Sequence, residues 1–128
     1  MSLSNQQQLF TLDVARLIAK ADELGIKLTF GEAFRTLDQQ NLYFMGYKTV
    51  AENGGLMLRK APVKSKTMQS NHLRRLAVDF NFFIAGVLTY DHPLLEQLGS
   101  YWESLDSKNR WGGHFTSFKD APHFERNA

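Results

Sequence analysis

The sequence contains no cysteine, which excludes disulfide bonds and every cysteine-ligated zinc site. Any metal ion must therefore be held by nitrogen and oxygen ligands. No apolar run approaches the roughly 20 residues that span a bilayer, so we predict no membrane insertion. Residues 1–8 also lack the basic start and apolar run of a secretory signal. We therefore expect synthesis in the cytoplasm without a signal peptide, and a target outside the cell would require a separate means of release.

A marked excess of either charge is also missing. Fifteen basic and 13 acidic residues give a formal net charge of +2, which is too small to indicate a nucleic-acid-binding protein. The 43% of hydrophobic and 22% of charged residues are ordinary for a globular chain and argue against disorder. At 128 residues, the chain is long enough for one core. We predict a single domain spanning residues 1–128, and expect a monomer.

The first half of the chain predicts two helices and a strand. Apolar residues recur every three or four positions after Ser4, which predicts a helix capped by Ser4 and ended by Gly25. Residues 26–30 alternate as a short strand, and a second helix is predicted from Thr36 to about Gly46. The basic, turn-rich residues 53–68 indicate a loop around a short strand, with its cations on a solvated surface.

The second half is dominated by strands. Residues 76–90 alternate most clearly, with a hairpin turn expected at Gly86. Asp91 and Pro93 fit the start of a helix that reaches Leu105. Residues 111–115 and 123–125 are predicted as closing strands. Because helices and antiparallel strands mix without regular βαβ alternation, the predicted class is α+β, a small central antiparallel sheet with helices packed on it.

Two remote segments carry the residue types of a metal site. In residues 70–79, His72 lies in a polar loop, and Asp79 lies in a strand on the face opposite the large apolar side chains. A buried carboxylate in such a strand must be paired or metal-bound. Taken alone, Asp79 could equally belong to a structural ion pair, and His72 could be a surface residue. Ser70 could hydrogen-bond a neighbouring ligand or only shape the loop.

The second segment is residues 120–125. Pro122 disfavours helical geometry at Ala121, so Asp120 and His123 are expected on a stiff turn, although an incidental histidine beside an ordinary turn would look the same. Catalytic zinc sites take three protein ligands and leave one position for water. We therefore predict His72, Asp79 and His123 as zinc ligands and Asp120 as the base beside that water. His92, expected to cap a helix, and His114 are the rival ligands.

These residues resemble a known family. Ser70-x-His72 with Ala77-x-Asp79, residues 111–113 and Asp120-x-x-His123-Phe124-Glu125 is similar to the zinc D-Ala-D-Ala carboxypeptidases and phage L-alanyl-D-glutamate endolysins. Residues 31–36, with Gln40, Leu42 and Tyr43, resemble the arginine-containing segment of that family. The ending of the sequence most resembles the endolysin branch, in which the base is often aspartate. One departure is Arg75, where the family usually has glycine.

The resemblance implies a peptidase fold of the D-Ala-D-Ala carboxypeptidase and hedgehog type, with Zn²⁺ as cofactor. It implies that zinc makes its water acidic, that Asp120 accepts the proton, and that Arg35 stabilises charge on the scissile carbonyl oxygen. Arg35 could otherwise form an ordinary surface salt bridge. Orienting or substrate-binding roles are implied for a further group of residues: Ser70, Gln40, Glu125 and Trp111, the last as a cleft wall or core residue.

The function predicted from these observations is hydrolysis of the peptidoglycan stem peptide, between L-alanine and D-glutamate, for host lysis by a phage or prophage. The alternatives are a D-Ala-D-Ala carboxypeptidase or dipeptidase, and a non-catalytic wall-binding or virion protein of the same fold. A nucleic-acid module is a distant further alternative, and its only support is a set of five cations: Lys60, Lys64, Lys66, Arg74 and Arg75.

Overall fold

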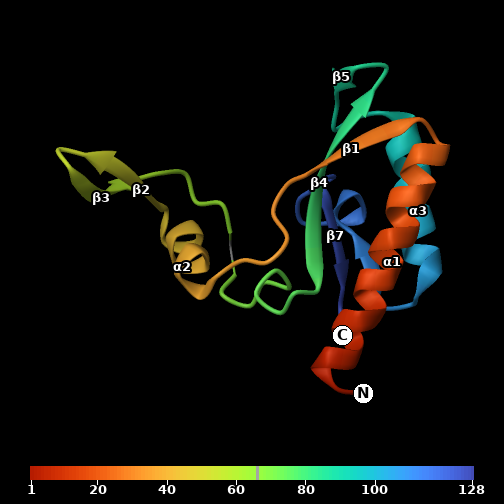
Figure 1. The fold of residues 1–128 in the computed structure, drawn as a ribbon, viewed down its shortest axis with the longest axis horizontal. Coiled ribbons are helices and arrows are strands. Elements are labelled where there is room, and N and C mark those ends of the chain that lie inside the picture. Colours follow the sequence, from red (N-terminus) through yellow and green to blue (C-terminus); the bar gives the residue numbers. More distant parts are fainter. Residues whose placement is uncertain (66) are drawn as a thin grey trace.

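The fold consists of a main body and a smaller arm that extends from it (Figure 1). The computed structural model describes residues 1–65 and 67–128. The main body holds a five-stranded antiparallel sheet and two helices, and the arm holds a short helix and a two-stranded sheet. Lys66, one of the cations of the basic segment, lies outside the described residues. None of the described helices is both long and apolar enough to cross a membrane.

Three α-helices begin at side-chain caps. Helix α1 (Leu3–Glu23) is capped by Ser2, whose Oγ accepts a hydrogen bond from the backbone N–H of Asn5. The predicted cap at Ser4 is therefore wrong, because the helix begins one residue before Ser4. Helix α2 (Leu37–Met45) is capped by Thr36 and helix α3 (Pro93–Leu105) by His92. The prediction that His92 caps a helix is confirmed.

The main sheet has the strand order β1-β4-β7-β6, and β5 also pairs with β4. Its strands are β1 (Ile26–Phe30), β4 (Ala77–Ile84), β5 (Val87–Leu88), β6 (Asn109–Trp111) and β7 (His123–Arg126). All the pairings in this sheet are antiparallel. The predicted α+β class is confirmed.

The core fills the space between the sheet and helices α1 and α3, which cover the same face (Figure 1). Strand β4 alternates strictly, so that Val78, Phe80 and Phe82 are buried in this core. Asp79 lies between them and therefore projects from the opposite face. The helices pack against one face of the sheet, and the polar cluster described below lies on the other face.

The two-stranded sheet of the arm is a β-hairpin formed by β2 (Tyr47–Glu52) and β3 (Gly55–Lys60). Asn53 and Gly54 connect the strands with positive φ angles of 50° and 77°, as a two-residue type I′ turn requires. The predicted loop around a short strand is wrong here, since two full strands pair. The Asn-Gly dipeptide between alternating residues was the available signal for this hairpin.

The predicted closing strand over residues 111–115 is also corrected. Strand β6 ends at Trp111, and residues Gly112–His114 form a 3₁₀ turn, η1. The chain turns there because the Gly112 carbonyl accepts hydrogen bonds from the backbone N–H groups of Phe115 and Asp120. A Cβ on Gly112 would lie 2.1 Å from the Asp120 carbonyl oxygen, so only glycine permits this close approach.

Arg75 occupies a backbone conformation that favours glycine, with a φ of 56°. Its guanidinium lies 4.4 Å from the centre of the Phe34 ring. We predict that Arg75→Gly has a free energy of unfolding about 1 kcal/mol higher than Arg75→Ala, because both variants lose the Phe34 contact and only alanine keeps the strain. Urea denaturation measures the difference. An alanine variant as stable as the glycine variant would show that the backbone here is unstrained.

Candidate metal centre and cleft

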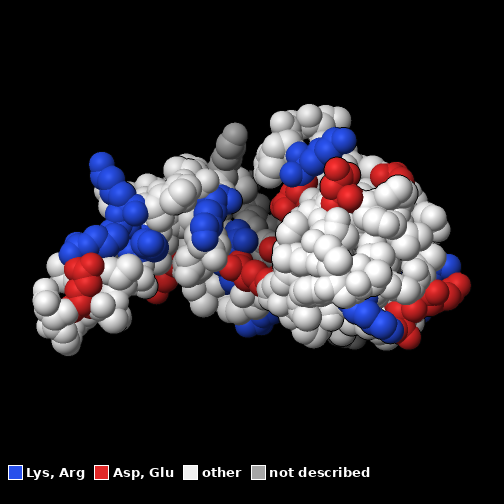
Figure 2. Space-filling model, turned by 90° about the horizontal axis from the view of Figure 1, so that it is seen from above, with Lys and Arg blue, Asp and Glu red and all other residues white. Residues whose placement is uncertain are grey.

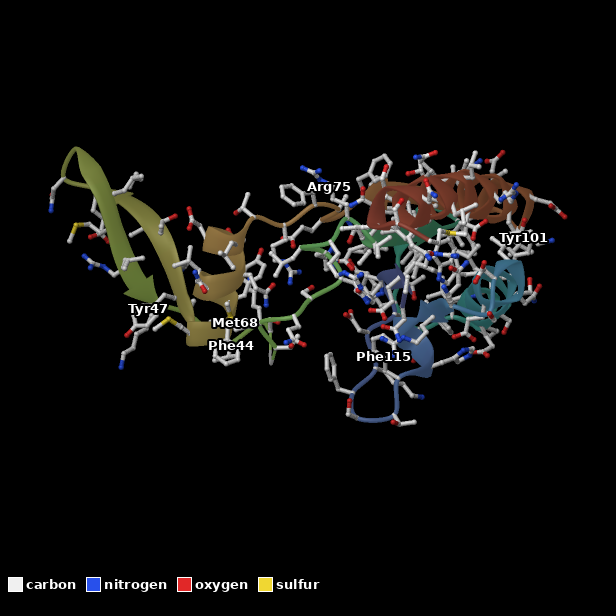
Figure 3. The ribbon with its side chains drawn as sticks, turned by 90° about the horizontal axis from the view of Figure 1, so that it is seen from below. Phe44, Tyr47, Met68, Arg75, Tyr101 and Phe115 are labelled. Carbon is white, nitrogen blue, oxygen red and sulfur yellow. The ribbon has the colours of Figure 1, made fainter. Side chains whose placement is uncertain are left out.

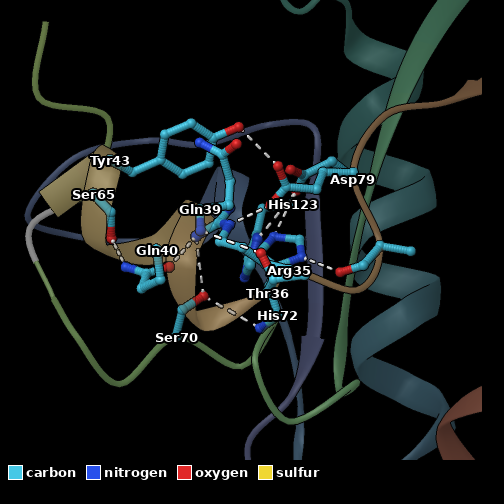
Figure 4. Close-up of polar contacts among 12 residues, drawn as sticks. Arg35, Thr36, Gln39, Gln40, Tyr43, Ser65, Ser70, His72, Asp79 and His123 are labelled. Atoms are coloured by element: carbon cyan, nitrogen blue, oxygen red, sulfur yellow. Dashed lines mark hydrogen bonds and ion pairs between the residues drawn. The ribbon is translucent and has the colours of Figure 1, made fainter. Parts of the chain in front are cut away.

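Three of the predicted site residues converge at one point. Ligand atoms of His72, Asp79 and His123 lie within 4.8 Å of one another. Asp79 Oδ1 is 3.4 Å from His72 Nε2 and 3.2 Å from His123 Nδ1. Asp79 and His123 are directly opposite each other in the β4–β7 pairing, which places their side chains on one face of the sheet. Figure 4 shows the two histidines and Asp79 together beside these strands.

His72 is held so that one ring nitrogen faces the cluster. The turn that precedes β4 buries its side chain, and Nδ1 lies 2.7 Å from the Ala33 carbonyl oxygen. Because that carbonyl can only accept, Nδ1 carries a hydrogen, and in a neutral ring Nε2 is then the nitrogen with the lone pair. Nε2 is buried and makes no hydrogen bond to any described residue. A buried acceptor of this kind, aimed at a carboxylate, fits a metal ligand.

His123 is oriented by a second carboxylate. Its Nε2 lies 2.6 Å from Glu125 Oε1, so Nε2–H donates to Glu125 and Nδ1 faces Asp79. Arg110 in turn donates from Nε to Glu125 at 2.8 Å. Carboxylates that hold the outer nitrogen of an imidazole are the usual second partner in zinc sites. Glu125, predicted as an orienting residue, lies where it can set the direction of His123.

The electrostatics of the cluster favour a cation. Burial raises the pKa of Asp79, but the imidazoles of His123 and His72 outweigh this effect and hold the pKa well below its usual range. Burial lowers the pKa of His123, whereas Asp79 and Glu125 raise it, with a net value of about 9. The acidic surroundings that stabilise a proton on His123 would equally stabilise a metal ion. Two nitrogen donors and one oxygen donor suit zinc.

Asp120 lines the same cleft as the three clustered residues. The backbone N–H of His123 donates to the Asp120 carbonyl oxygen at 3.0 Å, which closes the turn expected around Pro122. Burial raises the pKa of the Asp120 carboxyl; Asp79 raises it further, while His123, His72 and Arg35 lower it, and the net shift is upward. A carboxylate with a raised pKa beside a cation site has the properties of a general base.

Arg35 also lines the cleft and belongs to a polar network, and its backbone N–H donates to the His72 carbonyl oxygen at 3.2 Å (Figure 4). Its Nε donates to Glu32, and its Nη1 donates to Gln40 Oε1 at 2.7 Å. The guanidinium lies 4.8 Å from the centre of the Tyr43 ring, and the Tyr43 hydroxyl donates to the second oxygen of Glu32. Arg35 Nη2 makes no hydrogen bond within the described part of the chain, and it is the donor left for a ligand.

Gln40 and Ser70 support this arginine. Gln40 is fully buried, and its Nε2 donates to Ser65 Oγ and to the Thr67 carbonyl oxygen. It therefore fixes the chain that follows the arm against α2. Ser70 Oγ accepts from the backbone N–H of His72 at 3.2 Å and from Arg35 Nη1 at 3.4 Å. Ser70 thus links the arginine network to the histidine loop, so the predicted neighbour of a ligand also contacts Arg35.

Two other predicted candidates lie away from the cleft. Trp111 is buried, stacks on Phe124 and donates from Nε1 to the Ala121 carbonyl oxygen at 2.8 Å. It therefore belongs to the core and supports the Asp120 turn from behind. His114 is held by Glu96 and Glu103 of α3. Neither Trp111 nor His114 is among the described residues that line the cleft.

Glu32 and Tyr43 are residues of the site that the sequence analysis did not select. The backbone of Glu32 continues the sheet beyond β1, since its carbonyl oxygen accepts from the Asp79 N–H at 2.8 Å. Its carboxylate binds both Arg35 and Tyr43. The available signal was an acid three residues before the arginine, inside a segment already compared with the family. Glu32 therefore contacts the strand of Asp79 through its backbone and orients Arg35 through its carboxylate.

We predict that Glu32→Ala lowers the rate of substrate hydrolysis about tenfold, because Arg35 loses the carboxylate that fixes its guanidinium. Tyr43→Phe is the matched control, since it removes only the hydroxyl bond to Glu32 and keeps the ring beside Arg35. Steady-state kinetics and metal content should be measured together. Loss of bound metal from Glu32→Ala would show that Glu32 acts through Asp79 instead of Arg35.

The cleft has a volume of about 1240 Å³ and separates the arm side from the main body. Figure 2 shows this hollow, with acidic and basic side chains at its border. Glu32, Arg35 and Tyr43 line this cleft together with Phe115, Asp120 and His123. A His–Asp–His cluster at a cleft, with a further carboxylate beside it, is typical of metal-dependent hydrolases.

Comparison with known sequences identifies the family. The family model described as D-alanyl-D-alanine carboxypeptidase matches residues 63–126, half of the chain. The chain belongs to the D-alanyl-D-alanine carboxypeptidase family, as its motifs indicated. The matched segment contains His72, Asp79, Asp120 and His123, whereas Arg35 and Gln40 lie before it. A search of curated proteins finds no match.

Among solved structures, the L-Ala D-Glu endopeptidase ChiX of Serratia marcescens is similar, with a TM-score of 0.62. The alignment has 22% sequence identity and covers 90% of this chain and 78% of that chain. At this identity the likeness establishes the fold. The expected peptidase fold is therefore confirmed, and membership of the phage endolysin branch stays a prediction.

Proposed function

We propose that this protein is a zinc-dependent peptidase that cleaves the stem peptide of bacterial peptidoglycan between L-alanine and D-glutamate. The observation that carries the proposal is the convergence of His72, Asp79 and His123 in a cleft shared with Asp120. The family of the chain supports a peptidase acting on cell-wall peptides. Because we predict cytoplasmic synthesis, the enzyme would meet its substrate after release, as in phage lysis.

The residues of the cleft divide the chemistry among them. Zinc, held by His72, Asp79 and His123, would supply a Lewis acid and an acidified water. Asp120 would accept the proton of the attacking water and pass it to the leaving amine. Arg35, which is always charged, would stabilise negative charge on the scissile carbonyl oxygen through its remaining Nη2 donors. Glu125 and the Ala33 carbonyl would keep the two imidazoles in their ligating orientations.

Two observations favour an endopeptidase. The residue proposed as the base is Asp120, and the endolysin branch that the sequence resembles often has aspartate at this position. The printed description of the structural neighbour ChiX is an L-Ala D-Glu endopeptidase. A D-Ala-D-Ala carboxypeptidase is the second candidate, and it is favoured by the description of the matching family. Both reactions use the same zinc chemistry and differ in the bond that the cleft positions.

Digestion of purified peptidoglycan, followed by mass spectrometry of the muropeptides, separates the two candidates. Cleavage between L-alanine and D-glutamate would release stem peptides that begin with D-glutamate. Loss of only a terminal D-alanine would defeat the endopeptidase assignment and support the carboxypeptidase. A chelator should abolish either reaction, and added zinc should restore it. Digestion that continues unchanged in chelator would contradict the metal requirement.

A further inference from the structure

The hairpin arm, Tyr47–Lys60, exposes apolar side chains that nothing in the described chain covers. All six residues of β3 are exposed. Leu56, Met57 and Leu58 have exposed fractions of 78%, 44% and 59%. Figure 3 shows the hairpin extending away from the main body, with Tyr47 at its base. Isolated two-stranded hairpins are marginally stable in water, and exposed apolar patches mark interaction sites.

The strand register places Leu56 and Leu58 on one face of the hairpin and Met57 on the other. Residues directly opposite each other in an antiparallel pair share a face. Leu56 is opposite Ala51, Leu58 is opposite Thr49, and Lys60 is opposite Tyr47. One face therefore presents an apolar band near the turn and an aromatic residue with a lysine near the base. Amphipathic residues such as tyrosine and lysine are typical at the edge of a membrane-binding surface.

Positive charge is concentrated at the base of the arm. Lys60, opposite Tyr47, lies on the face of Leu56 and Leu58, whereas the pair Lys48 and Arg59 lies on the other face. The acid of the hairpin, Glu52, is ion-paired with Arg59. Lys64 follows shortly after the hairpin and lies 5.7 Å from the centre of the Tyr43 ring. Figure 2 shows lysine and arginine side chains clustered over this part of the molecule.

The charge and the area of this hairpin face indicate which kind of partner it can bind. A second copy of the chain would bring two basic arms together, and one short hairpin face falls well below the roughly 800 Å² per partner of a stable interface. A soluble polyanion would satisfy the cations but would leave Leu56 and Leu58 in water. An anionic lipid surface can bind both groups. Its head groups can pair with the cations at the base of the hairpin, and the boundary of its acyl chains can bury the apolar band.

We propose that the hairpin arm is a docking site for an anionic phospholipid surface. Leu56 and Leu58 would enter the head-group region, and Lys60, which lies on the same face, would meet the lipid phosphates. The contact is interfacial, and no part of the chain spans the bilayer. The proposal is independent of the catalytic function, because Leu56, Leu58 and Lys60 do not line the cleft.

Vesicle flotation of the full chain tests this site. The protein should bind vesicles of phosphatidylglycerol and phosphatidylcholine, should not bind phosphatidylcholine alone, and should dissociate as salt is raised. Leu56→Ser should weaken binding about tenfold, and Lys60→Gln should weaken it about fivefold. The matched controls lie on the main body. Val87→Ser removes an apolar side chain of 64% exposure, and Lys108→Gln removes an exposed lysine; neither should change binding.

Four outcomes would overturn the proposal. The first is no binding to anionic vesicles, and the second is equal binding by Leu56→Ser and the parent. The third is self-association of the parent in sedimentation experiments that Leu56→Ser abolishes, which would assign the face to a second copy. The fourth is binding of polyglutamate without vesicle binding, which would assign it to a soluble polyanion. Unchanged peptidoglycan digestion by Leu56→Ser would show that the variant is folded.

Discussion

Replacing Asp120 with asparagine is expected to lower the rate of peptidoglycan hydrolysis by about 10²–10⁴-fold while leaving the bound metal in place. The asparagine side chain has nearly the same shape, but it cannot accept a proton from water near neutral pH. General base catalysis contributes roughly this factor. Asp120 is absent from the ligand cluster, so its loss should leave the metal bound. Steady-state hydrolysis rates and metal analysis of the same preparations provide the measurement.

Asp91→Asn is the matched control for this variant, because Asp91 is exposed and precedes α3 far from the cleft. Its activity should equal that of the parent. An Asp120→Asn variant with the parent's rate would remove Asp120 from the mechanism. A variant that loses both rate and metal would instead make Asp120 a metal ligand, which would change the site but keep its location.

Replacing His72 with alanine is expected to remove both the metal and the activity. The substitution deletes the buried Nε2 that faces Asp79 without a hydrogen bond to any described residue. Metal-assisted charge stabilisation is worth several kcal/mol, and each 1.4 kcal/mol is a factor of ten in rate. We therefore expect a loss of at least about 10³-fold in hydrolysis, together with a zinc content near zero.

The chain provides a histidine control for this experiment. His114 is partly exposed and is bound by Glu96 and Glu103, so His114→Ala should keep its zinc and its activity. A His72→Ala variant that digests purified walls as fast as the parent would contradict the catalytic assignment. It would favour the third reading of the sequence, a non-catalytic wall-binding or virion protein of the same fold.

The convergence of the site could be predicted only in part. The alternation of residues 76–84 placed Asp79 on the face away from the core, because the side-chain period of a strand is two. The sequence has only four histidines, which limited the choice of the other two ligands. What the sequence could not supply was the register that sets Asp79 opposite His123. That register depends on pairing between strands far apart in the chain, which no local pattern encodes.

The groups that orient the ligands were even harder to predict from the sequence. His72 is held by the carbonyl of Ala33, and a backbone group gives no signal in a side-chain pattern. Glu125 was selected only through the family resemblance; the structure shows it two residues after His123 and on the same face of β7. Glu32 was hidden because its role depends on the tertiary approach of Arg35 and Tyr43. Local patterns can identify ligand types, whereas the fold determines their orientation.

Arg75 shows the opposite case, in which a departure from the family pattern predicted a structural feature. Glycine at this position implied a positive φ or close packing, and Arg75 has a φ of 56°. The backbone adopts this positive φ although residue 75 has a side chain, which lies on the Phe34 ring. His72, three residues earlier, therefore still reaches the cluster.

The most direct test of the account is the zinc stoichiometry of the purified chain and its single-site variants, measured by equilibrium dialysis. We expect one zinc ion per chain for the parent and for Asp120→Asn. We expect strongly reduced zinc for His72→Ala, Asp79→Ala and His123→Ala, provided that circular dichroism shows each variant folded. Undiminished zinc binding by any folded variant of these three would contradict a shared site built from two imidazoles and one aspartate.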